Sequence, residues 1–224
     1  MQLNLNTAAW DDLLTRGHGA VFLPPSLALA YERSSPRHGD WAFELEAEVV
    51  SGGLSGNRRL GYDIEFIPTY FVSDAFSVYA GPYYEHTPDW LVWQRDNLIG
   101  SFDQHTLQLN AGFDWSIDDR QELRLKLQAI GLDARLRDAY RVSGDGRAVA
   151  STEAVDDFSV RNLGLQIRYR YELAALSYLY VVYGRGGYAL DEDYPYRTGG
   201  VFGNTFSLRD DEQVLVKLSY RFDS

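Results

Sequence analysis

The sequence contains no cysteine, which excludes disulfides, thiolate nucleophiles and cysteine-ligated metal sites. Long apolar runs are also missing, since no stretch approaches the roughly 18 residues of a membrane-spanning helix. Positive charge is scarce: 21 Lys and Arg stand against 32 Asp and Glu, a formal net charge of −11. A nucleic-acid partner is therefore not expected, because it requires a basic surface that displaces counterions. Residues 1–6 lack the regions of a secretory signal, which favours a non-exported, mature or truncated chain.

Aromatic residues and glycine are abundant instead. Phe, Trp and Tyr make up 14% of the chain and there are 20 glycines, a composition typical of strands and turns. The clearest pattern covers residues 107–115, where Leu, Leu, Ala, Phe and Trp alternate with Gln, Asn, Gly and Asp. Successive side chains point to opposite faces of a strand, so this segment predicts one apolar and one polar face.

The same alternation predicts an all-β chain of about ten antiparallel strands in up-and-down order, forming a single domain over residues 1–224. The expected strands are 2–8, 26–34, 41–51, 58–72, 75–86, 101–115, 121–136, 158–172, 176–187 and 212–222. Short turns alternate with longer polar loops at about 9–25, 87–101, 137–157 and 188–211. This arrangement is typical of a transmembrane β-barrel with short periplasmic turns and longer extracellular loops.

The expected strand 121–136 changes phase along its length. Its odd positions are apolar up to Leu127, whereas its even positions are apolar from Ile130 to Leu136. We expect a β-bulge after Leu127, because one inserted residue reverses the faces. The alternative is that the strand leaves the apolar layer there and continues as a hairpin in solvent.

Alternation alone does not say whether the apolar face points into a soluble barrel or outward into a membrane. Most of the expected strands reach the roughly 9–11 tilted residues that cross a bilayer. Aromatic side chains lie near strand ends, and membrane interfaces favour such rings. The expected interface aromatics are Trp41, Tyr70, Tyr84, Trp115, Tyr171, Tyr220 and Phe222. These features favour the transmembrane barrel over a soluble barrel that binds a small apolar ligand.

The polar face carries charged residues in mid-strand. Its acids come from early strands and its bases from late ones: Glu44, Glu46, Glu48, Asp63 and Glu65 against Arg124, Lys126, Arg168, Arg170, Lys217 and Arg221. In a barrel lumen, acids on one wall would satisfy bases on the other, and about ten strands would leave a narrow or plugged pore. The loop at 9–25, with Asp11, Asp12 and Arg16, is a candidate plug whose Arg16 would reach Glu44, Glu46 or Asp63. The alternative is an exposed loop.

Three segments resemble a known family. Residues 11–19 (DDLLTRGHG) resemble a DDRLTRGGP-type loop, and residues 102–109 (FDQHTLQL) are similar to a DQTTLSL strand start. The ending at 214–222 (VLVKLSYRF) looks like the closing strand of the same family. That family is the barrel region called domain of unknown function 5916, and the resemblance covers about residues 9–222. His18 and Gly19 stand where the family tends to have Gly-Pro, and Asp223 and Ser224 follow the final aromatic.

The resemblance implies a location and an architecture rather than a reaction. Members normally carry a carbohydrate-binding family 9-like module before the barrel, so this chain resembles the C-terminal part of a larger carbohydrate-associated protein of the bacterial outer membrane. Its expected role is a structural barrel or narrow pore. Its expected partners are outer-membrane lipid and, through the C-terminal strand, the barrel-assembly machinery.

Candidate catalytic groups are few, and the sequence predicts that the chain is not an enzyme. Of the four histidines, His86 ends an expected strand near Glu85 and Asp89, and His105 begins the next strand beside Asp103. Such a pair could meet across one hairpin and activate water, as in a rim hydrolase, but rim histidines in a polar loop are the preferred interpretation. The acidic runs 191–193 and 210–212 lack the spacing of a calcium loop, so no metal site and no cofactor is expected.

Overall fold

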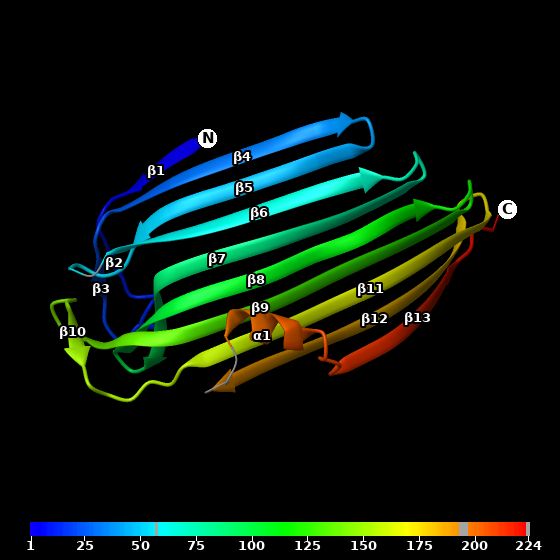
Figure 1. The fold of residues 1–224 in the computed structure, drawn as a ribbon. Coiled ribbons are helices and arrows are strands. Elements are labelled where there is room, and N and C mark those ends of the chain that lie inside the picture. The colour runs from blue at the N-terminus through cyan, green and yellow to red at the C-terminus, as the bar shows by residue number, and fades with distance from the viewer. Residues whose placement is uncertain (57, 193–196, 223–224) are drawn as a thin grey trace.

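The computed structural model describes residues 1–56, 58–192 and 197–222, and it is almost entirely β-structure. All ten expected strands are present and pair antiparallel in one sheet (Figure 1). In the order of the sheet they are β1 (Gln2–Asn6), β4 (Ser26–His38), β5 (Trp41–Gly52), β6 (Arg59–Phe71), β7 (Phe76–Arg95), β8 (Leu98–Ser116), β9 (Gln121–Val142), β11 (Phe158–Ala174), β12 (Ser177–Glu192) and β13 (Asp211–Ser219). The expected up-and-down order is therefore confirmed.

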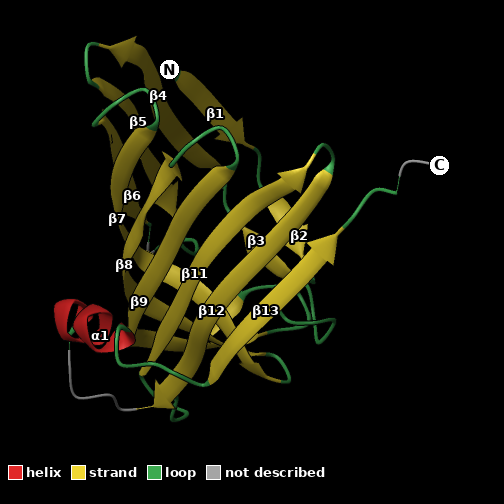
Figure 2. Ribbon diagram, turned by 90° about the vertical axis from the view of Figure 1, so that its right-hand side faces the viewer, coloured by secondary structure: helices red, strands yellow, loops and turns green. Residues whose placement is uncertain are grey.

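The sheet is curved but open. Over the described residues β1 and β13 are its two edge strands and do not pair with each other, so the expected closed barrel is not found. Figure 2 shows the curvature, with the edges facing each other across an opening. The short β1 pairs with β4 only from Gln2 to Asn6. With only five residues, β1 offers few backbone groups that could pair with β13 to close a barrel, and β13 is exposed along its whole length.

Several segments expected as loops are ordered extensions of the sheet. The prediction of a loop at 87–101 is wrong, because β7 continues to Arg95 and β8 begins at Leu98. Asp96 lies in the tight turn between them, with a φ of 45°. β9 continues to Val142 and pairs with the short β10 (Ala148–Ser151). The first loop contains the hairpin β2 (Ala9–Asp11) and β3 (Val21–Leu23), and the loop before β13 contains the helix α1 (Thr198–Thr205).

The expected bulge after Leu127 is also wrong. β9 pairs with β8 without a shift in register from Glu122 to Leu136, and the register shifts only at Arg137. The apolar positions themselves change face instead, so Leu127 and Leu136 lie on opposite sides of a continuous strand. The strand does leave the apolar layer, as the alternative had it, but it remains inside the sheet between β8 and β11.

The apolar face of the sheet is its convex face. In Figure 2, α1 lies outside the curve and the β2–β3 hairpin lies on the opposite side. α1 places Phe202 against Ala129 and Leu163, which share the face of Leu127. Its backbone also lies over Gly131, where a Cβ would fall 2.5 Å from the Phe202 Cα, so only glycine allows this close approach.

A compact core lies at the end of the sheet that carries the longer connections. Val21 of β3 packs there with Leu54, Ile99 and Val142, all at most 5% exposed. Phe102 is fully buried and its ring meets Phe158 edge-on at 5.1 Å. The first loop is therefore held by packing at this end. No helix in the described part of the chain is long and apolar enough to cross a membrane.

Candidate functional site

Two histidines and an aspartate meet on the convex face, just beyond its belt of apolar side chains, which on β8 runs from Leu107 to Trp115. His86 of β7 lies directly opposite His105 of β8, and the rings stack 4.2 Å apart at an angle of 5°. His86 Nε2 lies 2.8 Å from Asp103 Oδ1, and His105 Nε2 lies 3.7 Å from the same oxygen. Because side chains two residues apart share a face, Asp103 and His105 present their polar atoms to one point.

Irregular pairing on both sides of β8 shapes this point. The register between β7 and β8 shifts between Thr87 and Trp90, a segment that contains Pro88. On the other side, Arg137 of β9 has no partner in the ladder between Leu136 and Asp138. A bulge re-aims the side chain of its extra residue. Arg137 accordingly donates a hydrogen bond from its guanidinium to Asp103 Oδ2 at 2.7 Å.

Tyr84 completes the group on the side that faces the apolar residues of the belt. Its hydroxyl lies 2.8 Å from His105 Nδ1, so it fixes the orientation of the imidazole while Nε2 faces Asp103. The ring of Tyr62, from the neighbouring β6, meets that of His86 edge-on at 5.5 Å. The side chains of His86, Asp103 and His105 remain 21–29% exposed, so solvent reaches the cluster. We call Tyr84, His86, Asp103, His105 and Arg137 the histidine cluster.

The electrostatics of the cluster keep its carboxylate charged and one imidazole neutral. Partial burial alone would raise the pKa of Asp103, but the hydrogen bond with His86 and the charge of Arg137 outweigh it and lower that pKa. Burial lowers the pKa of His105, and the neighbouring His86 lowers it further. The cluster is therefore arranged as a carboxylate between donors, with two ring nitrogens directed at it.

The pKa of His105 gives the first prediction. We expect His105 to titrate below the ordinary value of 6.5 and its pKa to rise in the His86→Phe variant, because the repulsion between the imidazoles is then gone. Since the folded pKa is lowered, the stability that this group contributes is complete above about pH 6.5 and is lost as the pH falls through the folded pKa. Histidine ring resonances followed by NMR against pH measure the pKa of His105 in the wild type and in the variant. An unchanged His105 pKa in the variant would contradict the assigned coupling.

The sequence offered the meeting of His86 and His105 across one hairpin as the alternative to rim histidines in a polar loop. The preferred interpretation is wrong, because the two residues lie within β7 and β8. The sequence also placed the wrong acids beside His86. Glu85 follows the alternation to the concave face, where it accepts a hydrogen bond from Thr87. Asp89 faces Arg59 at 3.4 Å. The acid beside His86 is Asp103. Arg137 was missed entirely, although the proline at position 88 signalled irregular pairing here.

The comparison with protein families decides the membership of the chain. Residues 5–224 match the family described as Domain of unknown function (DUF5916). The chain belongs to the DUF5916 family. No curated protein and no solved structure matches it. The resemblance seen in the three sequence segments is thus confirmed at the level of the family.

The charged residues expected to face each other across a lumen share the concave face of the DUF5916 sheet. The acids are neighbours: Glu46 lies directly opposite Glu65, and Glu48 opposite Asp63. Three of the bases form ion pairs with acids on their own or a neighbouring strand. Arg124 forms ion pairs with Asp114 and Glu122. Glu122 also forms ion pairs with Arg168 and Arg170. The long-range pairing of early acids with late bases is therefore not how these arginines are satisfied. Lys217 and Arg221 lie on and just after the last strand.

The expected interface aromatics gather mostly at the tight-turn end of the DUF5916 sheet. The ring centroids of Trp41 and Tyr70 lie 4.8 Å apart, and those of Tyr220 and Phe222 lie 4.9 Å apart. Trp115 packs on Phe76, and Tyr171 lies opposite Gln121 near the next turn. Tyr84 is the exception, since it lies at the other end of the belt beside the histidine cluster.

The first loop of this DUF5916 chain forms a compact turn. Asp11 Oδ1 accepts a hydrogen bond from the Leu14 amide, and the buried Thr15 hydroxyl donates to the Asp12 carbonyl. Arg16, with a φ of 53°, places its guanidinium 4.4 Å above the Trp93 ring. The expected contact of Arg16 with Glu44, Glu46 or Asp63 is therefore replaced by a contact with β7.

The two acidic runs serve as partners for neighbouring groups. Asp191 pairs with Arg161 at 2.8 Å, Asp210 accepts a hydrogen bond from the Tyr188 amide, and Glu212 pairs with Arg209. Asp193 lies outside the described residues. The interpretation of the runs as acidic loop segments is therefore wrong for most of these residues, since Asp191 lies in β12 and Asp211 and Glu212 lie in β13.

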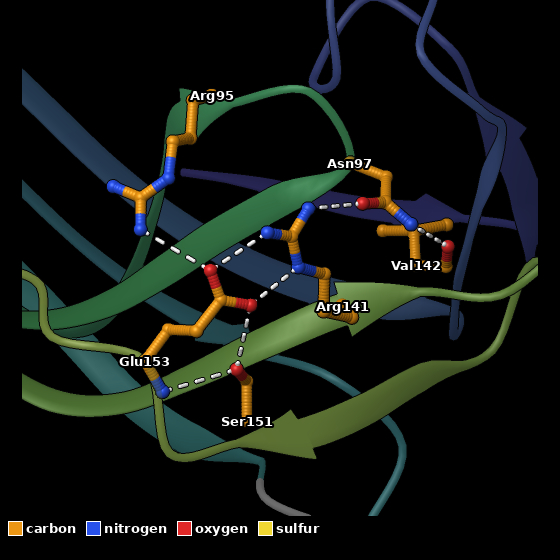
Figure 3. A network of polar contacts seen from close by, with 6 residues as sticks. All are labelled: Arg95, Asn97, Arg141, Val142, Ser151 and Glu153. Atoms are coloured by element: carbon orange, nitrogen blue, oxygen red, sulfur yellow. Dashed lines mark hydrogen bonds and ion pairs between the residues drawn. The ribbon is translucent and has the colours of Figure 1, made fainter.

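A second polar network ties the two long hairpins together (Figure 3). Glu153 accepts two hydrogen bonds from Arg141, at 2.6 and 2.7 Å, and a third from Arg95 at 3.1 Å. The tip residue Asn97 donates from its side-chain amide to the Val142 carbonyl at 2.7 Å. The network thus joins the tip of the β7–β8 hairpin to the segment that follows β10.

The charge of Glu153 gives the second prediction. The hydrogen bonds from Arg141 lower the pKa of Glu153 to about 2. Its contribution to stability is complete above the ordinary value of 4.5 and disappears as the pH falls towards about 2. The Glu153→Gln variant should keep the fold but exchange the amide hydrogens of β10 faster. Carboxyl NMR titration checks the pKa, and a midpoint near 4.5 would show that the network does not form.

Proposed function

We propose that this chain is a wall of a β-barrel in the bacterial outer membrane. Its convex face contacts lipid and its concave face lines the interior. The observation that carries the proposal is an apolar face that the protein itself leaves uncovered. Soluble proteins rarely expose a contiguous apolar patch larger than a few hundred Å², so such a face calls for a lipid or protein partner.

The uncovered face extends over both halves of the sheet. Ile64 and Phe66 of β6 are 46% and 43% exposed, and Val214, Val216 and Leu218 of β13 are between 62% and 68% exposed. They share the convex face with the apolar residues of the central strands, since each pairs through the ladder with a residue of that set. A soluble ligand-binding barrel would instead have its apolar face on the concave side.

The height of the apolar belt fits a bilayer. On β8 the outward residues run from Leu107 to Trp115, and strands cross a bilayer with about 9–11 residues. Aromatic side chains mark both limits: Trp115, Trp41 and Tyr70 at the tight-turn end, and Tyr62 and Tyr84 at the other. The histidine cluster and the Glu153 network lie beyond this belt, on the side of the longer connections.

The concave face supports a polar interior rather than a ligand-binding core. It contains a hollow of about 580 Å³ whose lining includes the polar residues Tyr79, Asn110, Lys126, Gln128, Gln166 and Gln213. Hydrogen bonds connect Gln128 to Asn110 and Asn110 to Glu65 across the strands. We propose a structural barrel or a narrow pore, without a reaction of its own.

The open edges support a role within a larger protein. Unpaired strand edges expose hydrogen-bonding groups that hydrocarbon cannot satisfy, so in a membrane both β1 and β13 need partner strands. We propose that further strands of a longer carbohydrate-associated parent complete the barrel. A carbohydrate-binding module in that parent and recognition of the last strand by the barrel-assembly machinery belong to the same proposal.

Flotation with phospholipid vesicles tests the proposal. The full chain, refolded in detergent and dialysed into vesicles, should float with the lipid and resist extraction by alkaline buffer. The same sample run unboiled and boiled on a gel should show a compact, faster band only when unboiled. A folded monomer that remains in aqueous buffer and does not float would contradict the membrane proposal.

A further inference from the structure

We propose that His86, Asp103 and His105 bind one divalent metal ion, either zinc or a neighbouring first-row metal. The three residues offer two ring nitrogens and one carboxylate oxygen that all lie within 4.8 Å of one another. The site does not depend on the membrane, because it is built from one hairpin and the bulge beside it.

The donor set suits such an ion. Imidazole nitrogen and carboxylate oxygen together are ligands of zinc and of neighbouring first-row metals, whereas calcium and magnesium prefer oxygen alone. Zinc bonds of about 2.0–2.2 Å hold tetrahedral ligand atoms roughly 3.3 Å apart. The distances from Asp103 Oδ1 to the two Nε2 atoms, 2.8 and 3.7 Å, bracket that spacing. The two rings, which now stack at 5°, must turn out of their parallel arrangement so that both in-plane Nε2 lone pairs point at one ion.

The surroundings of the three ligands are those of a built metal site. Tyr84 is positioned to accept the Nδ1 proton of His105, which leaves Nε2 as the free ligand nitrogen. Arg137 holds the second oxygen of Asp103, so the first oxygen remains directed at the imidazoles. A metal ligand fixed on its far side in this way loses less freedom when the ion binds. The opening towards solvent leaves a coordination position for water.

Zinc titration of the full chain tests the proposal, with a chromogenic chelator as competitor. We expect one zinc ion per chain, and at least a tenfold weaker affinity in each of the variants His86→Gln, His105→Gln and Asp103→Asn. His38→Gln is the matched control, since His38 lies at the opposite end of the sheet beside Trp41, and its affinity should equal that of the wild type. Undiminished affinity in His105→Gln and Asp103→Asn, or no binding by the wild type, would overturn the proposal.

X-ray absorption of the zinc-loaded wild type avoids any dependence on how the variants fold. The expected spectrum shows two imidazoles and light-atom ligands at about 2.0–2.2 Å. A spectrum with one imidazole or none would overturn the site. The Tyr84→Phe variant adds a test of positioning: the affinity should fall by roughly 10–100-fold, while the two imidazoles remain in the spectrum. Both results can be obtained whether or not the chain enters vesicles, so this site and the proposed function fail independently.

Discussion

Replacing Phe66 by arginine is expected to destabilise the vesicle-inserted protein by about 2–4 kcal/mol. Phe66 lies midway between Tyr62 and Tyr70 on the convex face of β6, at the centre of the proposed lipid belt. Its side chain is 43% exposed and its ring contacts that of Phe43 at 6.1 Å. If lipid covers this face, the guanidinium must enter hydrocarbon. Denaturant unfolding in vesicles measures the loss.

The neighbouring residue provides the control. Glu65 points to the concave face, directly opposite Glu46 and beside other acids. Glu65→Arg should therefore cost much less than Phe66→Arg, because it places a positive charge among carboxylates and outside lipid. If water covered the convex face, Phe66→Arg would cost only about 0.5 kcal/mol or less, as exposed substitutions usually do. Equal effects of the two variants would contradict the assignment of the faces.

Removing the ring of Phe102 is expected to have the second large effect on the free energy of unfolding. The ring is fully buried and meets Phe158 edge-on at 5.1 Å. Phe102→Ala leaves a cavity in a packed core and should cost about 3–5 kcal/mol. It should also loosen the histidine cluster, since Phe102 precedes Asp103 in the strand. Denaturant unfolding gives the energy, and the histidine NMR spectrum reports the local change.

Phe206→Ala is the matched truncation. Phe206 follows α1, its side chain is 41% exposed, and its ring meets Phe202 at 5.5 Å. Because little surface is removed from packing, this change should cost less than about 1 kcal/mol. If Phe102→Ala cost no more than Phe206→Ala, the core at this end of the sheet would not be packed as the structure shows.

Much of the fold was predictable because strand periodicity is a local signal. All ten strands were located, and most of their boundaries agree within a few residues; the larger differences are extensions. Residues 107–115 show why: each outward residue from Leu107 to Trp115 is apolar and each inward one is small or polar. The open edges were not predictable, because closure depends on curvature and on strands that pair far apart in the sequence.

The histidine cluster was only half predictable. His86 and His105 are brought together by one hairpin, so their spacing in the sequence indicates their meeting. Arg137 comes from a third strand and reaches Asp103 through a bulge at its own position, which the change of apolar phase after Leu127 does not mark. The apolar pattern changed face because the core changed side of the sheet. A bulge and a change of core side leave the same one-residue shift in the sequence.

A nitroxide accessibility scan along β8 tests the central claim most directly. The chain has no cysteine, so single cysteines from residue 107 to residue 115 can be labelled without removing native thiols. In vesicles, labels at the odd positions should be accessible to oxygen dissolved in lipid and protected from a water-soluble nickel complex. Labels at the even positions should show the reverse. If the odd positions were open to the nickel complex, or if no two-residue period appeared, the convex face would not contact lipid and the proposed barrel wall would be contradicted.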